Sequence, residues 1–382
     1  MLPREITEGD YPAIQALHRS VGWPERSMAG WRWLHANPAR LETGAPAGWV
    51  VDGPDGTPAA HAGNLIQRFR LGDRSLYGAS GFSIIVSPAA RGSSRSLLKA
   101  FASQPGVFAR YTFNANTKSQ PLYVRHGMKA WPEQTHALKL SWIVNPVPLA
   151  LGRLLRRLYD VAPRIVSGLG EQLMNDRLGR AVRLALPPGV GPLTDFSDTS
   201  PYARFWERLA TEGRLLADRS PEVQRWRLQD PDLSIPPLAL TFERDGAVVG
   251  YAMALMAKSN ILEPPVLEII DLETLEGHAD AAPALLTALR RAARAMGAAK
   301  LRMQTVTPFM LQRLGDLAGA ARREGGWGHC HVRFQEDAPD PALWSPTPYD
   351  GDYAVCLRPV PLGEAVRRGH AVRAAGSVTS KA

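Results

Sequence analysis

The chain has 382 residues, 45% hydrophobic and 21% charged, with a net charge of +9. This length favours two domains, and the balance is that of an ordinary globular protein. The positive charge suits an anionic partner, but arginine is spread along the chain, which disfavours nucleic-acid binding. With two cysteines, no signal-peptide pattern and no long apolar run, we expect a cytoplasmic protein without a disulfide framework.

The first part of the chain predicts helices, then a meander, then a strand–loop–helix unit. Apolar residues recur at helical spacing over 8–22, and a second short helix ends near 37–38. Turn residues at 54–56 and 72–73 predict two hairpins, with strands at 49–51, 59–65, 69–71 and 75–77. Further elements are expected in this order: a strand at 82–86, a polar loop at 91–96, a helix, a strand at 107–113 and a helix at 120–126. This order predicts a mixed α/β layer rather than a doubly wound sheet.

The second part of the chain repeats this punctuation at nearly one offset. The matched features are Trp33 to Pro38 with Trp226 to Pro231, Asp55-Gly56 with Asp245-Gly246, and Pro12 with Pro201. Their shared order indicates a duplicated domain. The strand at 82–86 then corresponds to 267–272, and the strand at 107–113 to 300–306.

The segment between the repeats is rich in leucine and arginine and predicts two amphipathic basic helices over 146–188. Such helices fit either contact with a membrane surface or, more commonly, a bridging pair packed on both domains. We therefore expect domains at 1–143 and 191–360, a helical linker at 144–190 and a flexible tail at 361–382.

A polar loop at Arg91-Gly92-Ser93-Ser94-Arg95-Ser96 opens the helix that follows the strand at 82–86. A helix N-terminus presents unpaired N–H groups and the positive end of the helix dipole, so it suits a phosphate, and the two arginines add charge. The alternative is that Ser93, Ser94 and Ser96 only cap the helix.

The chain resembles the GNAT superfamily of acyl-coenzyme A transferases in two motifs. That family's phosphate loop, Arg/Gln-x-x-Gly-x-Gly/Ala, follows a Val-x-Pro turn, and here Val86-Ser87-Pro88 precedes the loop at 91–96, with serine at both small positions. Its second motif, Asn-x-x-Ala-x-x-Leu-Tyr-x-x-x-Gly-Phe, resembles 116–128, where Asn116, Ser119, Tyr123 and Gly127 fall in register. The resemblance implies two tandem GNAT-like domains of the mixed α/β class, joined by the helical linker.

The resemblance also implies roles for these residues in the first repeat. Acyl-coenzyme A would bind the loop through its pyrophosphate and the strand through its pantetheine arm, and Tyr123 would protonate the leaving thiolate. The implied coenzyme-binding residues are Ile84, Ile85, Val86, Arg91, Gly92, Ser93, Ser94, Arg95, Ser96, Asn116 and Ser119. An amine or hydroxyl acceptor (a small molecule, a saccharide or a peptide) would attack directly, and no metal is required.

The general base is not assigned by the motifs, because the strand from Tyr77 to Val86 carries no carboxylate. The remaining candidates are His61, His126, Asp52 and Glu268, a water chain to bulk solvent, or a substrate amine that is already deprotonated. The acidic and aromatic segment Tyr349 to Tyr353 is a candidate for the acceptor site. As a metal site, His329-Cys330-His331 lacks a second ligand pair at useful spacing.

The second repeat is expected to be non-catalytic, because acids at 273–280 replace the phosphate loop and Phe309 to Gly315 holds no tyrosine. Tandem GNAT proteins of polysaccharide or secondary-metabolite acylation resemble the chain in the 33–38 element, the Arg-Gly loop and 116–121. Two other functions stay open: an aminoacyl-tRNA-dependent transferase of the Fem type, and a non-catalytic binding protein.

Overall fold

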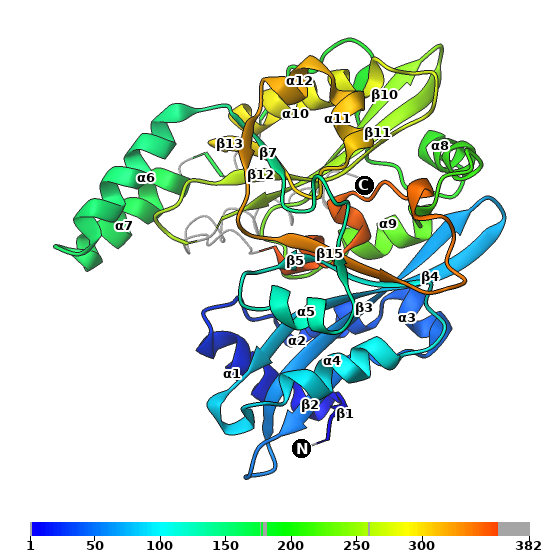
Figure 1. Ribbon diagram of the computed structural model, residues 1–382. Coiled ribbons are helices and arrows are strands. Elements are labelled where there is room, and N and C mark those ends of the chain that lie inside the picture. Colours follow the sequence, from blue (N-terminus) through cyan, green and yellow to red (C-terminus); the bar gives the residue numbers. More distant parts are fainter. Residues whose placement is uncertain (1, 176, 179–181, 259, 358–382) are drawn as a thin grey trace, which may run out of the picture.

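The computed structural model describes residues 2–175, 177–178, 182–258 and 260–357, and shows two mixed β-sheets with helices packed against them (Figure 1). The sheets lie one above the other in this view, and a helical hairpin projects from the upper one. The expected tail at 361–382 lies outside the described residues. Within the described ranges, no helix combines the length and apolar character needed to cross a membrane.

The first sheet has the order β1-β2-β3-β4-β5-β15-β6, with β9 also paired to β3. All its pairs are antiparallel except β4 with β5, which is parallel. Its strands are β1 (Arg4–Glu5), β2 (Gly48–Asp52), β3 (Pro58–Leu71), β4 (Arg74–Val86), β5 (Ala109–Ala115), β6 (Lys129–Ala130), β9 (Leu216–Ala217) and β15 (His329–Phe334). The expected hairpin turns at 54–56 and 72–73 are confirmed. The four short strands predicted from 59 to 86 are wrong as separate elements, because 59–71 and 75–86 each belong to one continuous strand.

Helices cover both faces of the first sheet. Along β2, Val51 packs with Phe101 on one face, whereas Val50 packs with Ile14 and Trp31 on the other, as alternation along a strand requires. The helical elements are η1 (Glu8–Asp10), α1 (Tyr11–Ser20), α2 (Met28–His35), α3 (Pro38–Thr43), η2 (Pro88–Ala90), α4 (Ser94–Ser103) and α5 (Gln120–Arg125).

The second sheet has the order β14-β7-β13-β12-β11-β10-β8, and its β12–β13 pair is the parallel one. Its strands are β7 (Lys139–Ile143), β8 (Val190–Pro192), β10 (Leu238–Arg244), β11 (Ala247–Ala257), β12 (Val266–Thr274), β13 (Lys300–Met303) and β14 (Arg322–Glu324). The other helical elements are α6 (Pro146–Tyr159), α7 (Pro163–Asn175), α8 (Pro201–Ala210), α9 (Pro221–Leu228), α10 (Ala281–Ala295), α11 (Pro308–Leu314), α12 (Asp316–Gly319), η3 (Pro341–Leu343), η4 (Pro348–Asp350) and α13 (Tyr353–Cys356). The linker helices α6 and α7 form the projecting hairpin.

The two halves exchange strands, and the second half also places β9 beside β3 of the first sheet. Strand β7 precedes the linker yet pairs with β13 and β14 of the second sheet, whereas β15, from the second half, pairs with β5 and β6 of the first sheet. The two sheets therefore interlock, and neither is completed by one half alone.

Two tryptophans that the repeat places in register meet where the halves join. The rings of Trp33 on α2 and Trp226 on α9 are stacked with centroids 4.9 Å apart. Each indole N–H donates to the other residue's carbonyl oxygen, at 2.7 and 3.1 Å. This reciprocal contact is what a duplicated element related by a pseudo-twofold axis produces.

Candidate active site

Strands β4 and β5 diverge part-way along the first sheet. Their parallel pairing covers only three residue pairs and ends at Ser80 with Tyr111. Just beyond, β4 bulges against β3, and Ser83 has a φ of 49°, which is uncommon for a residue other than glycine. The ring of His61 on β3 hydrogen-bonds the Ser83 carbonyl at 3.0 Å. Because a bulge bends its strand, it directs the end of β4 away from β5.

A cavity of about 270 Å³ lies at this divergence. It is bounded by β4 and β5, by α1, α2 and α5 of the first half, and by segments of the second half. Its lining includes His18, Trp23, Trp31, His61, Phe82, Ser83, Ile84, Thr112, Asn116, Ser119, Tyr123, Leu233, Trp327, Asp352, Val355 and Cys356. A concave site between two domains with a few convergent polar groups is the usual setting of a ligand site.

The structure brings four of the predicted site residues to this cavity: Ile84, Asn116, Ser119 and Tyr123. The other residues predicted from the coenzyme motif do not line it: Ile85, Val86, Arg91, Gly92, Ser93, Ser94, Arg95 and Ser96. The last residues of β4 lead from the cavity to this loop. The cavity and the loop therefore lie at two ends of one stretch of chain.

The loop at 91–96 has the features expected of an anion site. Helix α4 begins at Ser94, and Gly92 has a φ of 93° with open space where a Cβ would lie. The Ser93 hydroxyl is buried without a hydrogen-bond partner in the described part of the chain. Arg91 and Arg95 are exposed, and no described carboxylate forms an ion pair with either. Two unpaired arginines at the start of a ten-residue helix suit a phosphate group.

Asn116 and Ser119 shape the turn that starts α5. The Asn116 side-chain oxygen accepts from the backbone N–H groups of Lys118 and Ser119, at 3.0 and 2.9 Å. The Ser119 hydroxyl in turn accepts from the Asn116 N–H at 3.1 Å. This closed turn fixes the position of Tyr123 one turn further along.

Tyr123 reaches the cavity from α5 and is buried. Burial raises the pKa of its phenol, the nearby Asp352 adds to this rise, and the Thr112 hydroxyl acts in the opposite direction. The phenol is therefore protonated at neutral pH, which is the state that a general acid requires.

Asp352 supplies the carboxylate that β4 lacks. Its Oδ1 accepts from the Phe113 N–H of β5 at 2.8 Å and from the Ser80 hydroxyl of β4 at 3.1 Å, so it joins the two strands where they part. Burial raises the pKa of Asp352 to about 6, while hydrogen bonds from Phe113, Ser80 and Thr112 act to lower it. The sequence indicated 349–353 only as a candidate for the acceptor site, because no local pattern links this segment to β4.

Of the four sequence candidates for a general base, only His61 lines the cavity. Burial and the neighbouring His18 lower the pKa of His61 to about 3, so its imidazole is neutral. The other three have structural contacts or lie elsewhere: Asp52 pairs with Arg4, Glu268 pairs with Arg302, and His126 ends α5 beside Arg333.

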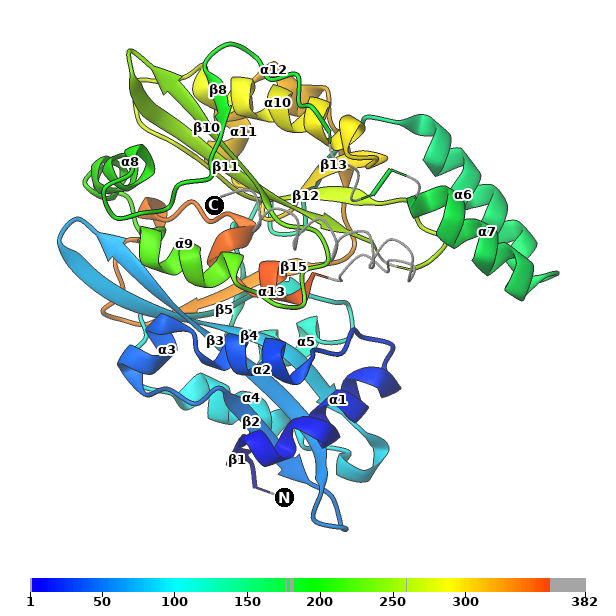
Figure 2. The ribbon, with the colours of Figure 1, turned by 180° about the vertical axis from the view of Figure 1, so that it is seen from behind.

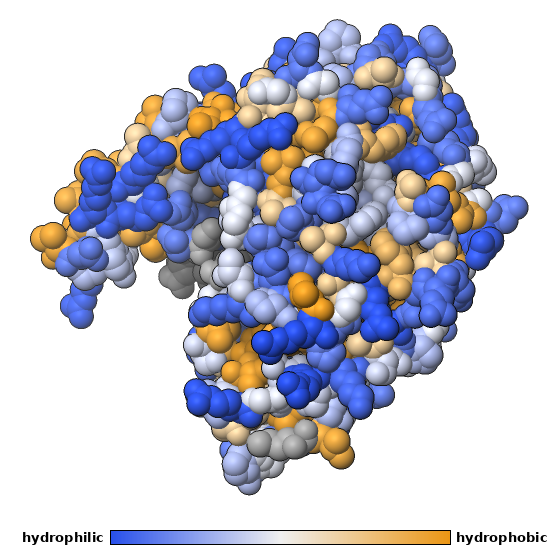
Figure 3. All heavy atoms as spheres, in the orientation of Figure 1, coloured by the Kyte–Doolittle hydropathy of each residue, from blue (hydrophilic) through white to orange (hydrophobic). Residues whose placement is uncertain are grey.

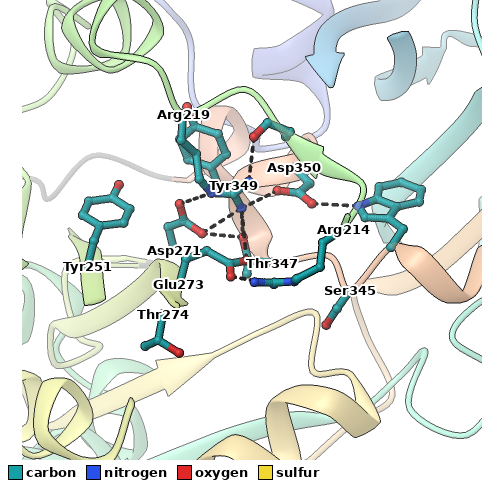
Figure 4. Close-up of polar contacts among 12 residues, drawn as sticks. Arg214, Arg219, Tyr251, Asp271, Glu273, Thr274, Ser345, Thr347, Tyr349 and Asp350 are labelled. Atoms are coloured by element: carbon teal, nitrogen blue, oxygen red, sulfur yellow. Dashed lines mark hydrogen bonds and ion pairs between the residues drawn. The ribbon is translucent and has the colours of Figure 1, made fainter. Parts of the chain in front are cut away.

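The second sheet has the same divergence, but charged side chains occupy it. Strands β12 and β13 are paired only as far as Ile269 with Met303. Beyond this point Asp271 and Glu273 turn inward, and Figure 4 shows them around Arg219. Arg219 donates to Asp271 at 2.7 Å and to Asp350 at 2.8 Å, and all three side chains are almost fully buried.

Neighbouring groups complete this buried network. Arg214 donates to Glu273 at 2.7 Å, and the Thr347 hydroxyl donates to Asp271 at 2.8 Å. Burial acts to lower the pKa of Arg219, but the carboxylates around it outweigh this and raise it. The prediction that Glu273 lies in a phosphate-loop equivalent is wrong, because Glu273 belongs to β12 and is buried in this network.

His329, Cys330 and His331 lie on β15. Within the described ranges, no group of three or more His, Cys, Asp or Glu side chains is arranged to hold a metal ion.

No protein-family model and no curated protein matches the sequence. Among solved structures, the chain is similar to a GCN5-related N-acetyltransferase from Anabaena variabilis, with 12% identity, a TM-score of 0.52, and coverage of 87% of this chain and 72% of that one. It is also similar to Saccharomyces cerevisiae N-myristoyltransferase with bound myristoyl-CoA, with 9% identity, a TM-score of 0.50, and coverage of 94% and 85%.

The chain has the GNAT fold. It contains this fold twice, since each sheet has a bulged central strand that diverges from its parallel neighbour. The two GNAT halves are joined by the α6–α7 hairpin, as the sequence predicts. Within the described ranges, the first GNAT half contains the cavity, the cationic helix start and Tyr123.

Proposed function

We propose that the chain is an acyltransferase that moves an acyl group from acyl-coenzyme A to an amine or hydroxyl acceptor, using its first GNAT half. One observation supports this most: the cavity at the β4–β5 divergence is flanked by a protonated phenol, Tyr123, and by a buried carboxyl, Asp352. An acid and a base facing one site are what direct acyl transfer requires. The solved neighbours include proteins named as acetyl- and myristoyltransferases.

In this proposal, the loop at 91–96 holds the pyrophosphate of the coenzyme and β4 guides its pantetheine arm along 84–86. The backbone at the bulge then faces the thioester, where an N–H group can stabilise the developing oxyanion. The acceptor enters from the side of α1, α2 and the second half, where Trp23, Trp31 and Trp327 line the cavity. Acetyl-coenzyme A, longer acyl-coenzymes A and carrier-bound acyl groups all react through a thioester, so this chemistry does not distinguish between these donors.

Asp352 accepts the proton of the attacking amine or hydroxyl as the new C–N or C–O bond forms. Tyr123 gives its proton to the thiolate as the C–S bond breaks. The Thr112 hydroxyl lines the same cavity and acts to lower the pKa of both groups, which supports a role for it between them. A proton passed from Asp352 through Thr112 to Tyr123 restores the starting state, so one turnover leaves the protein unchanged.

The second GNAT half acts as a scaffold in this proposal. It contributes Asp352, Val355 and Trp327 to the cavity of the first half, while the network around Arg219 occupies its own divergence. We also propose the domain limits expected from the sequence, at 1–143, 144–190, 191–360 and 361–382, and a cytoplasmic location.

Calorimetric titration of the full chain with acetyl-coenzyme A and longer acyl-coenzymes A tests the proposal. We expect binding that the charge reversal Arg91→Glu weakens about tenfold or more, because an exposed arginine beside a helix N-terminus is replaced by a like charge. The matched control is Arg74→Glu, which lies at the far end of β4. Absence of binding to every thioester would overturn the proposal and leave a Fem-type or non-catalytic function.

A further inference from the structure

Among the described residues, the contacts that anchor the α6–α7 hairpin lie along one side of it. Leu155, Val166 and Met174 pack with Leu262 in a small core separate from those of the two sheets. Glycines allow this close approach, since a Cβ at Gly170 would lie 2.7 Å from the Leu262 side chain. From this contact the helices project away from the body of the molecule, as both ribbon views show (Figures 1 and 2).

An apolar strip runs along the hairpin outside this core. Leu154 and Leu158 are 52% and 45% exposed, and on α7 the exposed row consists of Ile165, Leu169 and Leu173. Residues four apart share one side of a helix, so each row is continuous. Figure 3 shows orange apolar atoms on the projecting hairpin beside dark blue ones. Exposed rows of this kind are unusual on a monomeric soluble protein.

The two rows lie on the same side of the hairpin. On both helices an exposed residue comes one position before a buried one, as Leu154 does before Leu155 and Ile165 before Val166. On each helix, the exposed row is therefore rotated about the helix axis in the same direction from the buried residues, Leu155 on α6 and Val166 on α7. Because α6 and α7 run antiparallel, this common turn places both rows on one face.

Arginines border this face on both outer edges. Arg153 and Arg157 each come one position before a leucine of the α6 row, and Arg164 comes one position before Ile165. All three are exposed, and none forms an ion pair with a described carboxylate. By contrast Arg156, on the anchored side, pairs with Glu263 at 2.6 Å. The free charges thus belong to the face with the apolar strip.

We propose that this face docks on an anionic phospholipid surface. Leucine and isoleucine side chains between cationic borders are the arrangement by which a helix lies in the membrane interface, with its apolar side among the acyl chains and its arginines at the headgroups. A second copy of the chain is a poorer occupant, because pairing two such faces brings arginine borders of like charge together. The docking does not depend on the acyltransfer proposed above.

Co-sedimentation of the full chain with vesicles tests this assignment. We expect binding to equimolar phosphatidylserine and phosphatidylcholine, and little to phosphatidylcholine alone. The variant Leu158→Glu/Ile165→Glu should abolish binding, and Arg153→Glu/Arg157→Glu should weaken it roughly tenfold or more. Leu41→Glu, an equally exposed leucine on α3, is the matched control and should bind normally. Circular dichroism and thermal unfolding show that each variant is folded.

Three results would overturn the assignment. The first is the absence of binding to anionic vesicles. The second is binding that the hairpin variants leave unchanged, which places the lipid contact elsewhere. The third is concentration-dependent dimerisation that Leu158→Glu/Ile165→Glu abolishes without any vesicle binding, which assigns the face to a second copy.

Discussion

Both GNAT halves have an opening where two parallel strands diverge, but the opening is a cavity in the first half and is filled by side chains in the second. In the first half, the divergence of β4 and β5 leaves a cavity, and the Arg26 ion pairs with Asp230 and Asp232 lie in its lining without filling it. In the second half, the divergence of β12 and β13 is occupied by Arg219 and three carboxylates. The fold creates the opening in both sheets, because a bulge turns one strand away from its parallel neighbour. Side chains alone decide which opening stays available.

One short segment serves both openings. Asp350 pairs with Arg219 in the second half, whereas Asp352, two residues later, reaches β4 and β5 in the first. The alternating direction of the chain at this point sends the two carboxyls to opposite sheets. The ion pair of Asp350 in the second half therefore holds the segment 350–352, which places Asp352 in the cavity of the first half.

The largest effect is expected from removing the central cation of the filled opening. Arg219→Met leaves Asp271 and Asp350 buried without a counter-charge, which costs about 3–5 kcal/mol of folding free energy. Urea unfolding of the full chain measures this loss. The matched control is Arg91→Met in the open half, which should change stability by less than about 0.5 kcal/mol because this arginine is exposed. Equal stability of both variants would show that the network is not what supports the second half.

In the open half, Asp352→Asn is expected to lower kcat about 100-fold or more, since the amide cannot accept the acceptor's proton. Coenzyme affinity should stay within about threefold, because Asp352 lies at the strand divergence and not at the helix start. Glu25→Gln is the control, as it removes another carboxylate of the cavity lining that is paired with Arg19 at the surface. A variant with normal turnover would remove Asp352 from the reaction.

The reaction proposed for the open half should also depend on pH. With a pKa of about 6, Asp352 becomes a competent base as pH rises, so kcat/KM should increase about tenfold per unit below pH 6 and level off above it. Because this folded-state pKa is raised, its contribution to stability is present at low pH and lost as pH rises through 6. Asp352→Asn should flatten the rate profile, whereas the stability profile keeps the contribution of Asp350, whose pKa burial also raises to about 6. A rate profile that is flat from pH 5 to 8 in the parent chain would contradict this assignment.

Much of the first GNAT half could be predicted from the sequence, because its signals are local. The turn at Asp55-Gly56, the helix start at Ser94 and the Asn116–Tyr123 register each depend on residues close in the chain. The repeat also placed Trp33 and Trp226 in register, and these two residues stack where the halves join.

The features that decide function within this fold could not be predicted, because they are non-local. Asp352 meets Ser80 across 272 positions of sequence, and β15 joins a sheet whose other main strands end before residue 131. Arg219 and Asp271 carry no pattern that distinguishes a buried ion pair from a solvated one. Only the folded structure reveals these contacts, those of Asp352 and β15 between the halves and those of Arg219 within the second half.

The smallest predicted effect concerns the two helix starts next to the openings. At α4 the Ser93 hydroxyl is buried and has no hydrogen-bond partner among the described residues, whereas at α10 Asp280 is paired with Arg244. Ser93→Ala should not lower the stability of the free protein, since a buried hydroxyl without a partner costs desolvation free energy that alanine does not. Affinity for acyl-coenzyme A should fall about threefold to tenfold if the hydroxyl turns to a phosphate oxygen. The control is Ser96→Ala, whose hydroxyl already donates to the Ser93 carbonyl at 2.9 Å. Calorimetry on both variants separates the two roles of the loop, because a serine that only starts the helix would alter stability and leave affinity unchanged.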